Sequence, residues 1–443
     1  MLFHTSSFLF YFLPIVFLFY FFLFKNNNKL RTLLLIVSGF LFYAAWNVKL
    51  SPLIIVTIIV NYYFSKKIIL TLESRKKKNL LIASICFNIF FLLLFKYADF
   101  FIVNINFLFN SSFETLNLPF PLALSFVTFQ TIAYLVDCYD GSILKTNIKK
   151  YSLFIIFFPQ LIAGPIVKYN NMMDQFSSEK NFSINSKNIC VALIIFAIGL
   201  IKKILIADNL SIIADQTFIN VNENLSLLEC WLGSISFTFQ IYFDFSAYID
   251  MATGIALLFN INLPQNFNSP YKASGIIDFW QRWHITLTLF LTNYVYTPLL
   301  KSFKNLTFFK SMLSTLIVFL IAGLWHGPSW LFVIFGGMHG AGLVINQIFK
   351  KYSFFKINKL FSQIITFTYI NISFIFFRSE NIQSALVLIK NMFVTDFINI
   401  FNINVISLPV NSIIALVVSF FICFIFINTH EIKKKIESSK ILD

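Results

Sequence analysis

Long runs of apolar residues constrain this chain more than any other feature of its sequence. Thirteen such blocks alternate with short polar segments, at about 8–24, 31–46, 52–64, 79–95, 118–137, 151–166, 189–206, 227–243, 246–260, 311–325, 329–349, 360–377 and 412–428. A helix of roughly 20 mostly apolar residues crosses a bilayer, and at this length only helices satisfy their own backbone hydrogen bonds within lipid. The blocks therefore predict an all-α, polytopic membrane protein.

The composition excludes a soluble fold. The chain is 58% hydrophobic and 12% charged, with a mean hydropathy of +0.78, whereas soluble domains are roughly 45–50% apolar and about 25% charged. Several blocks are short or are interrupted by Pro and Gly. We therefore expect a single integral membrane domain over residues 1–443, with about 11 transmembrane helices and additional re-entrant or in-plane helices.

The net charge of +15 does not indicate nucleic-acid binding, because the Lys residues lie in short runs between the apolar blocks. These runs predict the topology instead. Segments 25–31, 65–79 and 138–150 each contain several Lys or Arg residues, whereas segment 98–117 contains none. By the positive-inside rule the basic segments face the cytoplasm. We therefore expect the N-terminus outside the cell membrane and the C-terminus in the cytoplasm.

Polar residues interrupt the apolar blocks in three places, and the first is segment 237–250. An ionisable side chain within a membrane span costs on the order of 2.5–3.5 kcal/mol, so each one needs a reason. A helix over this segment would place Gln240 and Asp244 on one face. The acidic residues of this segment have two interpretations. Either they form structural bridges between helices, or they belong to a path for protons or substrate.

The second place is segment 279–298, which contains Arg282 and His284. Apolar residues recur at helical spacing from Trp280 to Tyr294, which predicts a helix with His284 on its apolar stripe. Arg282 is one of only four Arg residues in the chain. It favours a planar partner such as a carboxylate or a phosphate, and an internal ion pair with a nearby Asp is the alternative.

The third place is segment 321–342, which contains His326 and His339. Gly and Pro residues around His326 allow the backbone to break and to approach a ligand. A buried histidine with satisfied hydrogen bonds is the alternative for each residue. No Cys or His spacing suits a metal, and no nucleophile motif is present. Because histidine suits proton transfer near neutral pH, we predict general-base catalysis without a metal.

These stretches resemble the membrane-bound O-acyltransferase (MBOAT) family, and within it the alginate O-acetylation and peptidoglycan O-acetyltransferase membrane proteins. The matching motifs span residues 94–385 in the family's order and include P-Q-L-I-A-G-P-I-V, F-Q-I-Y-F-D-F-S-A-Y-I-D-M-A, L-P-Q-N-F-N-S-P-Y, D-F-W-Q-R-W-H-I-T-L and G-L-W-H-G. The chain departs from the family pattern at Thr292-Asn293 and Leu300-Lys301. Details of the acceptor side therefore lie outside the resemblance.

The resemblance implies a helical bundle around a central tunnel through the cell inner membrane, with a periplasmic N-terminus. It implies an O-acetyltransferase that uses cytoplasmic acetyl-CoA as its donor substrate and binds no cofactor. The acetyl group would reach an extracytoplasmic polysaccharide through a periplasmic SGNH-type acetyltransferase partner. His326 maps to the family's catalytic histidine and His284 to its companion. Direct attack by the acceptor and a relay through an acyl-histidine both remain open.

Seven further residues are candidates for contacts with the substrate or donor: Arg282, Trp325, Asp244, Gln240, His339, Lys202 and Lys203. The skew toward Phe, Ile, Asn and Lys, which suggests an AT-rich genome, and the short length favour peptidoglycan as the acceptor. Alginate or another exopolysaccharide is the alternative. A transporter with an intramembrane His/Asp proton relay is the alternative of another class. It predicts inverted repeats, which the sequence does not display.

Overall fold

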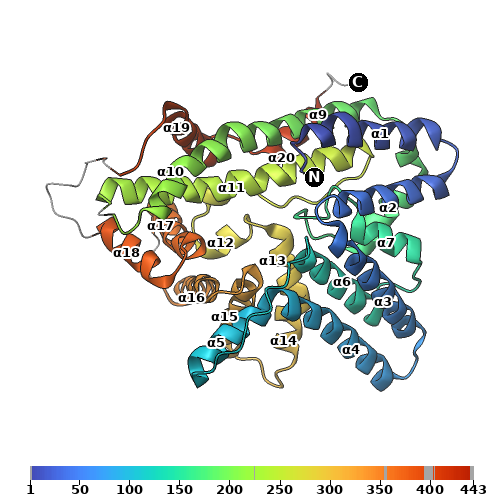
Figure 1. Cartoon of the computed structure of the whole chain (residues 1–443), viewed down its shortest axis with the longest axis horizontal. Helices are drawn as coiled ribbons and strands as arrows, with labels where there is room; N and C mark the ends of the chain where they lie inside the picture. The colour runs from blue at the N-terminus through green and yellow to red at the C-terminus, as the bar shows by residue number, and fades with distance from the viewer. Residues whose placement is uncertain (1, 224, 354–356, 394–402, 404, 440–443) are drawn as a thin grey trace. The chain divides into compact units, whose positions relative to one another are not determined.

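The computed structural model describes the whole chain except residues 1, 224, 354–356, 394–402, 404 and 440–443. The described residues form helices and loops and contain no β-strand (Figure 1). Seven helical runs among them are long and apolar enough to cross a membrane: Val48–Leu70, Ser74–Phe109, Ser186–Ile219, Leu227–Leu258, Phe308–His326, Trp330–Tyr352 and Lys359–Arg378. Two further helices, Val410–Phe424 and Thr429–Ser438, are bent by 62° relative to each other. They make an eighth candidate span if they cross the membrane together. The all-α, multi-pass fold is confirmed, but a count of about 11 crossings is not.

The chain divides into two compact units. The first comprises Met1–Phe196, Met251–Pro264 and Ser439–Asp443, and the second comprises Ala197–Asp250 and Gln265–Ser438. These are units of compactness, and the single membrane domain expected over residues 1–443 stays a prediction. All nine candidate site residues belong to the second unit, so the site can be described within that unit alone.

Five helices, α2, α3, α4, α6 and α7, pack against one another in the first unit. Helix α2 packs against α7, and α3 packs against α4 and α6 (Figure 1). Gly39 of α2 allows one close contact, because a Cβ there would lie only 1.9 Å from the backbone oxygen of Ile156. The elements of this unit are η1 (Phe8–Phe12), α1 (Leu13–Leu18), η2 (Phe19–Leu23), α2 (Asn28–Ala44), η3 (Val48–Leu50), α3 (Ser51–Leu70), α4 (Ser74–Leu92), η4 (Leu93–Tyr97), α5 (Ala98–Phe109), α6 (Leu124–Tyr139), α7 (Ile148–Ile156), α8 (Tyr169–Ser177), η5 (Glu179–Phe182) and most of α9 (Ser186–Ile201).

The second unit contains the longest helix of the described chain, α11, which continues into the first unit after Asp250. Apolar blocks 227–243 and 246–260, which we had treated as separate, are thus one helix. Asp244, which lies between the two blocks, is part of this helix and pairs with Lys203. The elements of this unit are η6 (Lys202–Ala207), α10 (Asp208–Ile219), α11 (Leu227–Leu258), η7 (Pro270–Lys272), α12 (Ile276–Trp280), α13 (Ile285–Leu291), η8 (Thr292–Tyr296), α14 (Thr297–Lys301), α15 (Phe308–His326), α16 (Trp330–Tyr352), α17 (Lys359–Arg378), α18 (Ile382–Phe393), α19 (Val410–Phe424) and α20 (Thr429–Ser438).

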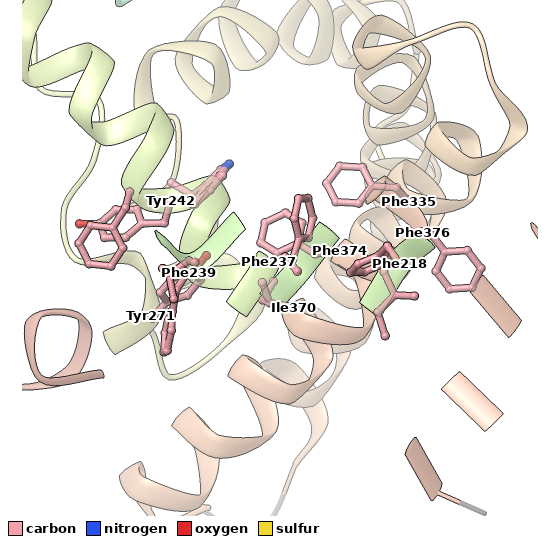
Figure 2. Close-up of a cluster of buried hydrophobic side chains, with 14 of the residues drawn as sticks. Phe218, Phe237, Phe239, Tyr242, Tyr271, Phe335, Ile370, Phe374 and Phe376 are labelled. Atoms are coloured by element: carbon pink, nitrogen blue, oxygen red, sulfur yellow. The ribbon is translucent and has the colours of Figure 1, made fainter. Parts of the chain in front are cut away.

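An aromatic core holds α11, α16 and α17 together in the second unit (Figure 2). Phe374 of α17 stacks on Phe335 of α16 with ring centroids 5.9 Å apart, and it meets the edge of Phe237 of α11 at 6.4 Å. Buried aromatic pairs of this kind add to the free energy of packing beyond the area that they bury. The core therefore fixes α16, the helix that follows His326 and carries His339.

Glycines bring α15 and α16 together as a close hairpin. A Cβ on Gly336 would lie 2.3 Å from the backbone oxygen of Phe319 and 2.9 Å from the Cα of Gly323. Small residues at such positions let helix backbones approach closely within a membrane. The two helices are separated by a break at Gly327 and Pro328, where the sequence predicted one. The hairpin thus holds the end of α15 in a defined place.

Candidate functional site

His326 is the last residue of α15 and is partly buried. Its ring lies among aromatic side chains, with centroid distances of 4.8 Å to Trp325, 5.2 Å to Phe377 and 5.7 Å to Phe335. Because Phe335 belongs to α16 and Phe377 to α17, three helices position this imidazole. Its surroundings are apolar, and electrostatic interactions with a reacting group are stronger there than in water.

His284 lies in the connection between α12 and α13, not within a continuous helix. The helical spacing from Trp280 to Tyr294 had predicted an unbroken helix, and that prediction is wrong. Helix α12 ends at Trp280 and α13 begins at Ile285, with His284 in the left-handed region at φ 42° and ψ 53°. This conformation is uncommon for a residue other than Gly, and such positions cluster at functional sites.

The imidazole of His284 is buried, with a residue exposure of 2%. Its centroid lies 4.9 Å from that of Phe245, which it meets edge-on, and 6.4 Å from that of Trp325. Trp325 therefore contacts the rings of both His284 and His326. Burial, followed by the nearby charge of His326, lowers the pKa of His284 to about 3. The ring is thus neutral near pH 7, the state in which it can accept a proton.

Asn266 holds the turn at His284, and it was not among the predicted site residues. Its side-chain Oδ1 accepts hydrogen bonds from the backbone N–H of Thr286 at 3.1 Å and from the Thr286 hydroxyl at 2.9 Å. The same oxygen lies 3.2 Å from Nδ1 of His284. The only signal in the sequence was the place of Asn266 in the L-P-Q-N-F-N-S-P-Y motif, which does not reveal what this residue contacts.

His339 is a buried histidine whose two ring nitrogens are both engaged. The indole N–H of Trp280 donates to Nδ1 at 3.2 Å, and Nε2 lies 3.0 Å from the hydroxyl oxygen of Ser373. That hydroxyl in turn donates to the backbone oxygen of Ile370 at 2.7 Å. His339 is therefore a buried histidine with satisfied hydrogen bonds, which was the alternative interpretation of this residue from the sequence.

Two of the predicted cations, Lys202 and Lys203, form ion pairs with α11. Lys202 Nζ lies 2.6 Å from Asp250 and 2.8 Å from the hydroxyl of Thr429, which itself donates to Asp250 at 2.8 Å. Lys203 Nζ bridges Asp244 at 2.7 Å and Asp208 at 2.9 Å. The Lys203 cluster is the more exposed, since both its acidic side chains are 52% accessible.

Arg282 pairs internally as well, because its Nε donates to Asp278 at 2.6 Å and its NH1 donates to the backbone oxygen of Asn268 at 3.3 Å. Gln240 differs from these residues. Its buried Oε1 has no hydrogen-bond partner within the described part of the chain. In that same part, no three His, Cys, Asp or Glu side chains gather closely enough to hold a metal ion.

The arrangement therefore combines two imidazoles that both contact the Trp325 indole with three cations of the same unit that are already paired with carboxylates. His326, which is partly accessible in apolar surroundings, suits removal of a proton from a hydroxyl group. The lowered pKa of His284 makes that ring the weaker base and suits it to a supporting role. Lys202, Lys203 and Arg282 already have carboxylate partners, so they would hold an anionic ligand only by sharing or exchanging those partners.

Comparison with known proteins gives one family match and several similar chains. Residues 142–382 match the membrane-bound O-acyltransferase family. The chain is 41% identical over 424 residues to the peptidoglycan O-acetyltransferase of Helicobacter pylori, covering 88% of this chain and 80% of that protein. It is 32% identical over 399 residues to the probable alginate O-acetylase AlgI of Pseudomonas aeruginosa, covering 89% and 75%. It is 24% identical over 239 residues to the teichoic acid D-alanyltransferase of Streptococcus thermophilus, covering 51% and 56%.

Proposed function

The chain belongs to the membrane-bound O-acyltransferase family, and on this premise we propose that it moves acetyl groups across the cell inner membrane for the O-acetylation of peptidoglycan. The donor is cytoplasmic acetyl-CoA. The acetyl group is delivered to a periplasmic SGNH-type acetyltransferase partner, which acts on the polymer. The observation that carries this proposal is the pair of imidazoles, His326 and His284, whose rings lie 4.8 Å and 6.4 Å from that of Trp325 in an acyltransferase scaffold.

Sequence identity favours peptidoglycan as the acceptor. The relative named for peptidoglycan is 41% identical to this chain, and the relative named for alginate is 32% identical, over a similar share of the chain. Alginate is the second candidate, because several relatives with that name match over most of the chain. The transporter alternative is set aside, since the family is one of acyltransferases.

The proposed chemistry is transfer from a thioester to a hydroxyl. The acceptor oxygen bonds to the acetyl carbonyl carbon, and the carbon–sulfur bond to CoA breaks. His326 takes the proton from the hydroxyl as the new bond forms, and the proton then passes to the thiolate of CoA. The products are an acetyl ester and CoA with a free thiol. Such general-base assistance is typically worth 10²–10⁴-fold in rate.

The phosphates of the donor need cations near the cytoplasmic side. Of the candidate cations Lys202, Lys203 and Arg282, Lys203 is the one most able to bind a phosphate. Its partners Asp244 and Asp208 are about half exposed, so a phosphate can compete with them for the ammonium group. Lys202 and Arg282 have less accessible carboxylate partners, which favours a role in holding the helices. Trp325 and Gln240 complete the set of proposed substrate contacts.

Release of CoA by purified protein in detergent, supplied with labelled acetyl-CoA and the periplasmic acetyltransferase partner as acceptor, tests the proposal. We expect wild-type protein to release CoA and His326→Ala to lose at least about 100-fold of that rate. His4→Ala is the matched control, because His4 lies in the first unit and has no proposed role. Undiminished release by a folded His326→Ala variant would remove that residue from the mechanism. Absence of release by the wild type would overturn acetyl-CoA as the donor.

The acceptor needs a separate measurement. Deletion of the gene in its host should lower the O-acetyl content of purified peptidoglycan, as measured by mass spectrometry after mild alkaline release of acetate. Complementation with the wild-type gene should restore the acetate, and complementation with His326→Ala should not. Unchanged peptidoglycan acetylation together with loss of acetate from an exopolysaccharide would shift the assignment to the second candidate.

A further inference from the structure

Asn266 is buried beside the proposed active site, with an exposure of 1%. Its side-chain oxygen receives the backbone N–H and the hydroxyl of Thr286, and the same oxygen faces Nδ1 of His284. Its backbone oxygen also accepts from the N–H of Ile285 at 2.9 Å. One residue thus organises the whole turn that carries His284.

These contacts determine which atom of the Asn266 amide faces His284. A backbone N–H can only donate, so the amide atom that contacts the Thr286 N–H must be the oxygen. That oxygen can only accept. The nitrogen of His284 that faces it at 3.2 Å must therefore carry a hydrogen. In a neutral imidazole one nitrogen is protonated and the other is an acceptor, so Nε2 of His284 has the lone pair.

The other end of the same amide gives a second observation. Nδ2 of Asn266 is buried and has no hydrogen-bond partner among the described residues. A buried donor without a partner costs free energy, and native proteins contain few of them. The three contacts of the Asn266 side chain all use Oδ1, so the free energy that this side chain contributes comes from its oxygen.

We propose that Asn266 is a positioning residue of the acyl-transfer site, which holds His284 as the Nδ1-protonated tautomer and leaves Nε2 as a proton acceptor. This inference rests on the function proposed above. When His326 takes the proton of the acceptor hydroxyl, it becomes a cation in apolar surroundings. The lone pair on His284 Nε2 stabilises that cation until the proton passes to the thiolate of CoA. The other tautomer would present an N–H to the same cation and would oppose its formation.

Two substitutions of Asn266 separate this role from simple support of the turn. Asn266→Asp keeps an acceptor opposite Nδ1, whereas Asn266→Leu has a similar size and no acceptor. The matched control is Asn346→Leu. Asn346 also caps a helix start in this unit, by accepting the N–H of Ile277 at 3.2 Å, and it has no proposed role in catalysis. All variants are purified as the full-length chain in detergent and compared by gel filtration, thermal unfolding and CoA release.

We expect Asn266→Leu to lower kcat by at least about 100-fold while KM for acetyl-CoA changes less than about threefold, because donor binding does not need the proton acceptor. Asn266→Asp should retain kcat to within about tenfold. Asn346→Leu should lower the unfolding temperature without this selective loss of kcat. Full kcat in a folded Asn266→Leu variant, or equal losses in the Leu and Asp variants, would overturn the proposal.

The pH profile of Asn266→Asp decides the question if Asn266→Leu does not fold. A carboxylate next to Nδ1 stabilises the imidazolium form and raises the pKa of His284. Phe245, Trp325 and Asn266 face the ring, and His326 is the titratable neighbour that acts on it. The acidic limb of the pH profile of kcat should therefore move to higher pH in Asn266→Asp. An acidic limb at the same pH as in the wild type would contradict the inference. If wild-type protein releases no CoA, the proposed function has failed and not this inference.

Discussion

The three histidines among the candidate site residues differ in what their ring nitrogens contact. His339 is enclosed by Trp280 and Ser373, with both nitrogens engaged. His284 has one nitrogen against Asn266, and His326 lies among aromatic rings at the end of a helix. Two of these environments suit proton transfer, whereas that of His339 suits a structural role. We accordingly treat His339 as part of the support for the site.

The role of His339 can be tested by His339→Phe. The substitution keeps an aromatic ring of similar shape but leaves the indole N–H of Trp280 buried without its acceptor. We expect a loss of about 1–3 kcal/mol in the free energy of unfolding, with kcat per folded molecule largely unchanged. Thermal unfolding and CoA release on the same preparation measure the two effects. A variant of normal stability that has lost its kcat would instead make His339 part of the chemistry.

The sequence indicated which residue types carry the chemistry but not what they contact. His326 could be singled out because Gly327 and Pro328 follow it. The partners of His284 and His339 could not, because Asn266 and Ser373 lie 18 and 34 positions away along the chain. Such contacts depend on how the helices pack. Helical periodicity reports which face of a helix is apolar and contains no information on its polar neighbours.

Among the helices, the hairpin of α15 and α16 bears most directly on the site. Its glycines have different surroundings. A Cβ on Gly336 would meet backbone atoms of Phe319 and Gly323, whereas a Cβ on Gly337 would meet only the Cδ2 of Leu320 at an ordinary 3.5 Å. Both residues appear in the sequence as one Gly-Gly pair. The pattern predicted two helices with a break between them, but not which glycine the close contact requires.

This difference predicts opposite outcomes for neighbouring substitutions. Gly336→Ala should destabilise the protein by about 1–3 kcal/mol, because the methyl group overpacks the contact between two backbones. It should also lower CoA release, since α15 ends at His326. Gly337→Ala should be neutral or slightly stabilising, because Ala has the higher helix propensity by about 1 kcal/mol. Equal unfolding temperatures for the two variants would show that the hairpin is looser than described.

The break between α12 and α13 shows where helical patterns fail. Apolar residues continue at helical spacing through residues 280–294, yet the backbone turns at His284 with a positive φ. The turn is held by hydrogen bonds to Asn266, whose side chain and backbone oxygens together accept from three donors in residues 285–286. Local propensity is a weak preference that tertiary contacts override. A periodic pattern therefore could not reveal the turn.

At the scale of the whole second unit, one buried ion pair joins segments that are far apart in the chain. Lys202 of η6 contacts Asp250 of α11 and Thr429 of α20. The side chains of Lys202 and Asp250 are only 10% and 14% accessible. Lys202→Met should therefore cost about 3–5 kcal/mol of stability, because it leaves a buried carboxylate without its partner. Lys202→Met with Asp250→Leu should recover much of the loss, as measured by thermal unfolding.

The double variant also tests whether Lys202 binds the donor. If Lys202 only joins helices, the stable double variant should keep its KM for acetyl-CoA within about threefold, because no donor contact has been removed. If Lys202 holds a phosphate, KM should rise much further while kcat at saturating donor changes little. Titration of the donor in the CoA-release assay distinguishes the two results.

The orientation of the molecule in its membrane can be tested on one helical run. Residues Ser74–Phe109, which comprise α4, η4 and α5, form an apolar run of 36 residues that is long enough to cross the bilayer core of about 30 Å. A single crossing by this run places its two ends on opposite sides of the membrane. Lys and Arg residues cluster before and within its first turn, and residues 98–117 at the other end have none. We therefore expect the end at Ser74 in the cytoplasm.

Single cysteines at the exposed positions Ser74 and Ser112 measure this directly. They are introduced into a variant whose five native cysteines are replaced by Ala and whose CoA release is retained. A membrane-impermeant maleimide should label Ser112→Cys in intact spheroplasts and should label Ser74→Cys only after permeabilisation, because lipid shields the cytoplasmic end. The reverse pattern would invert the topology and place the basic segments outside. Labelling of both positions in intact spheroplasts would contradict the single crossing by this run.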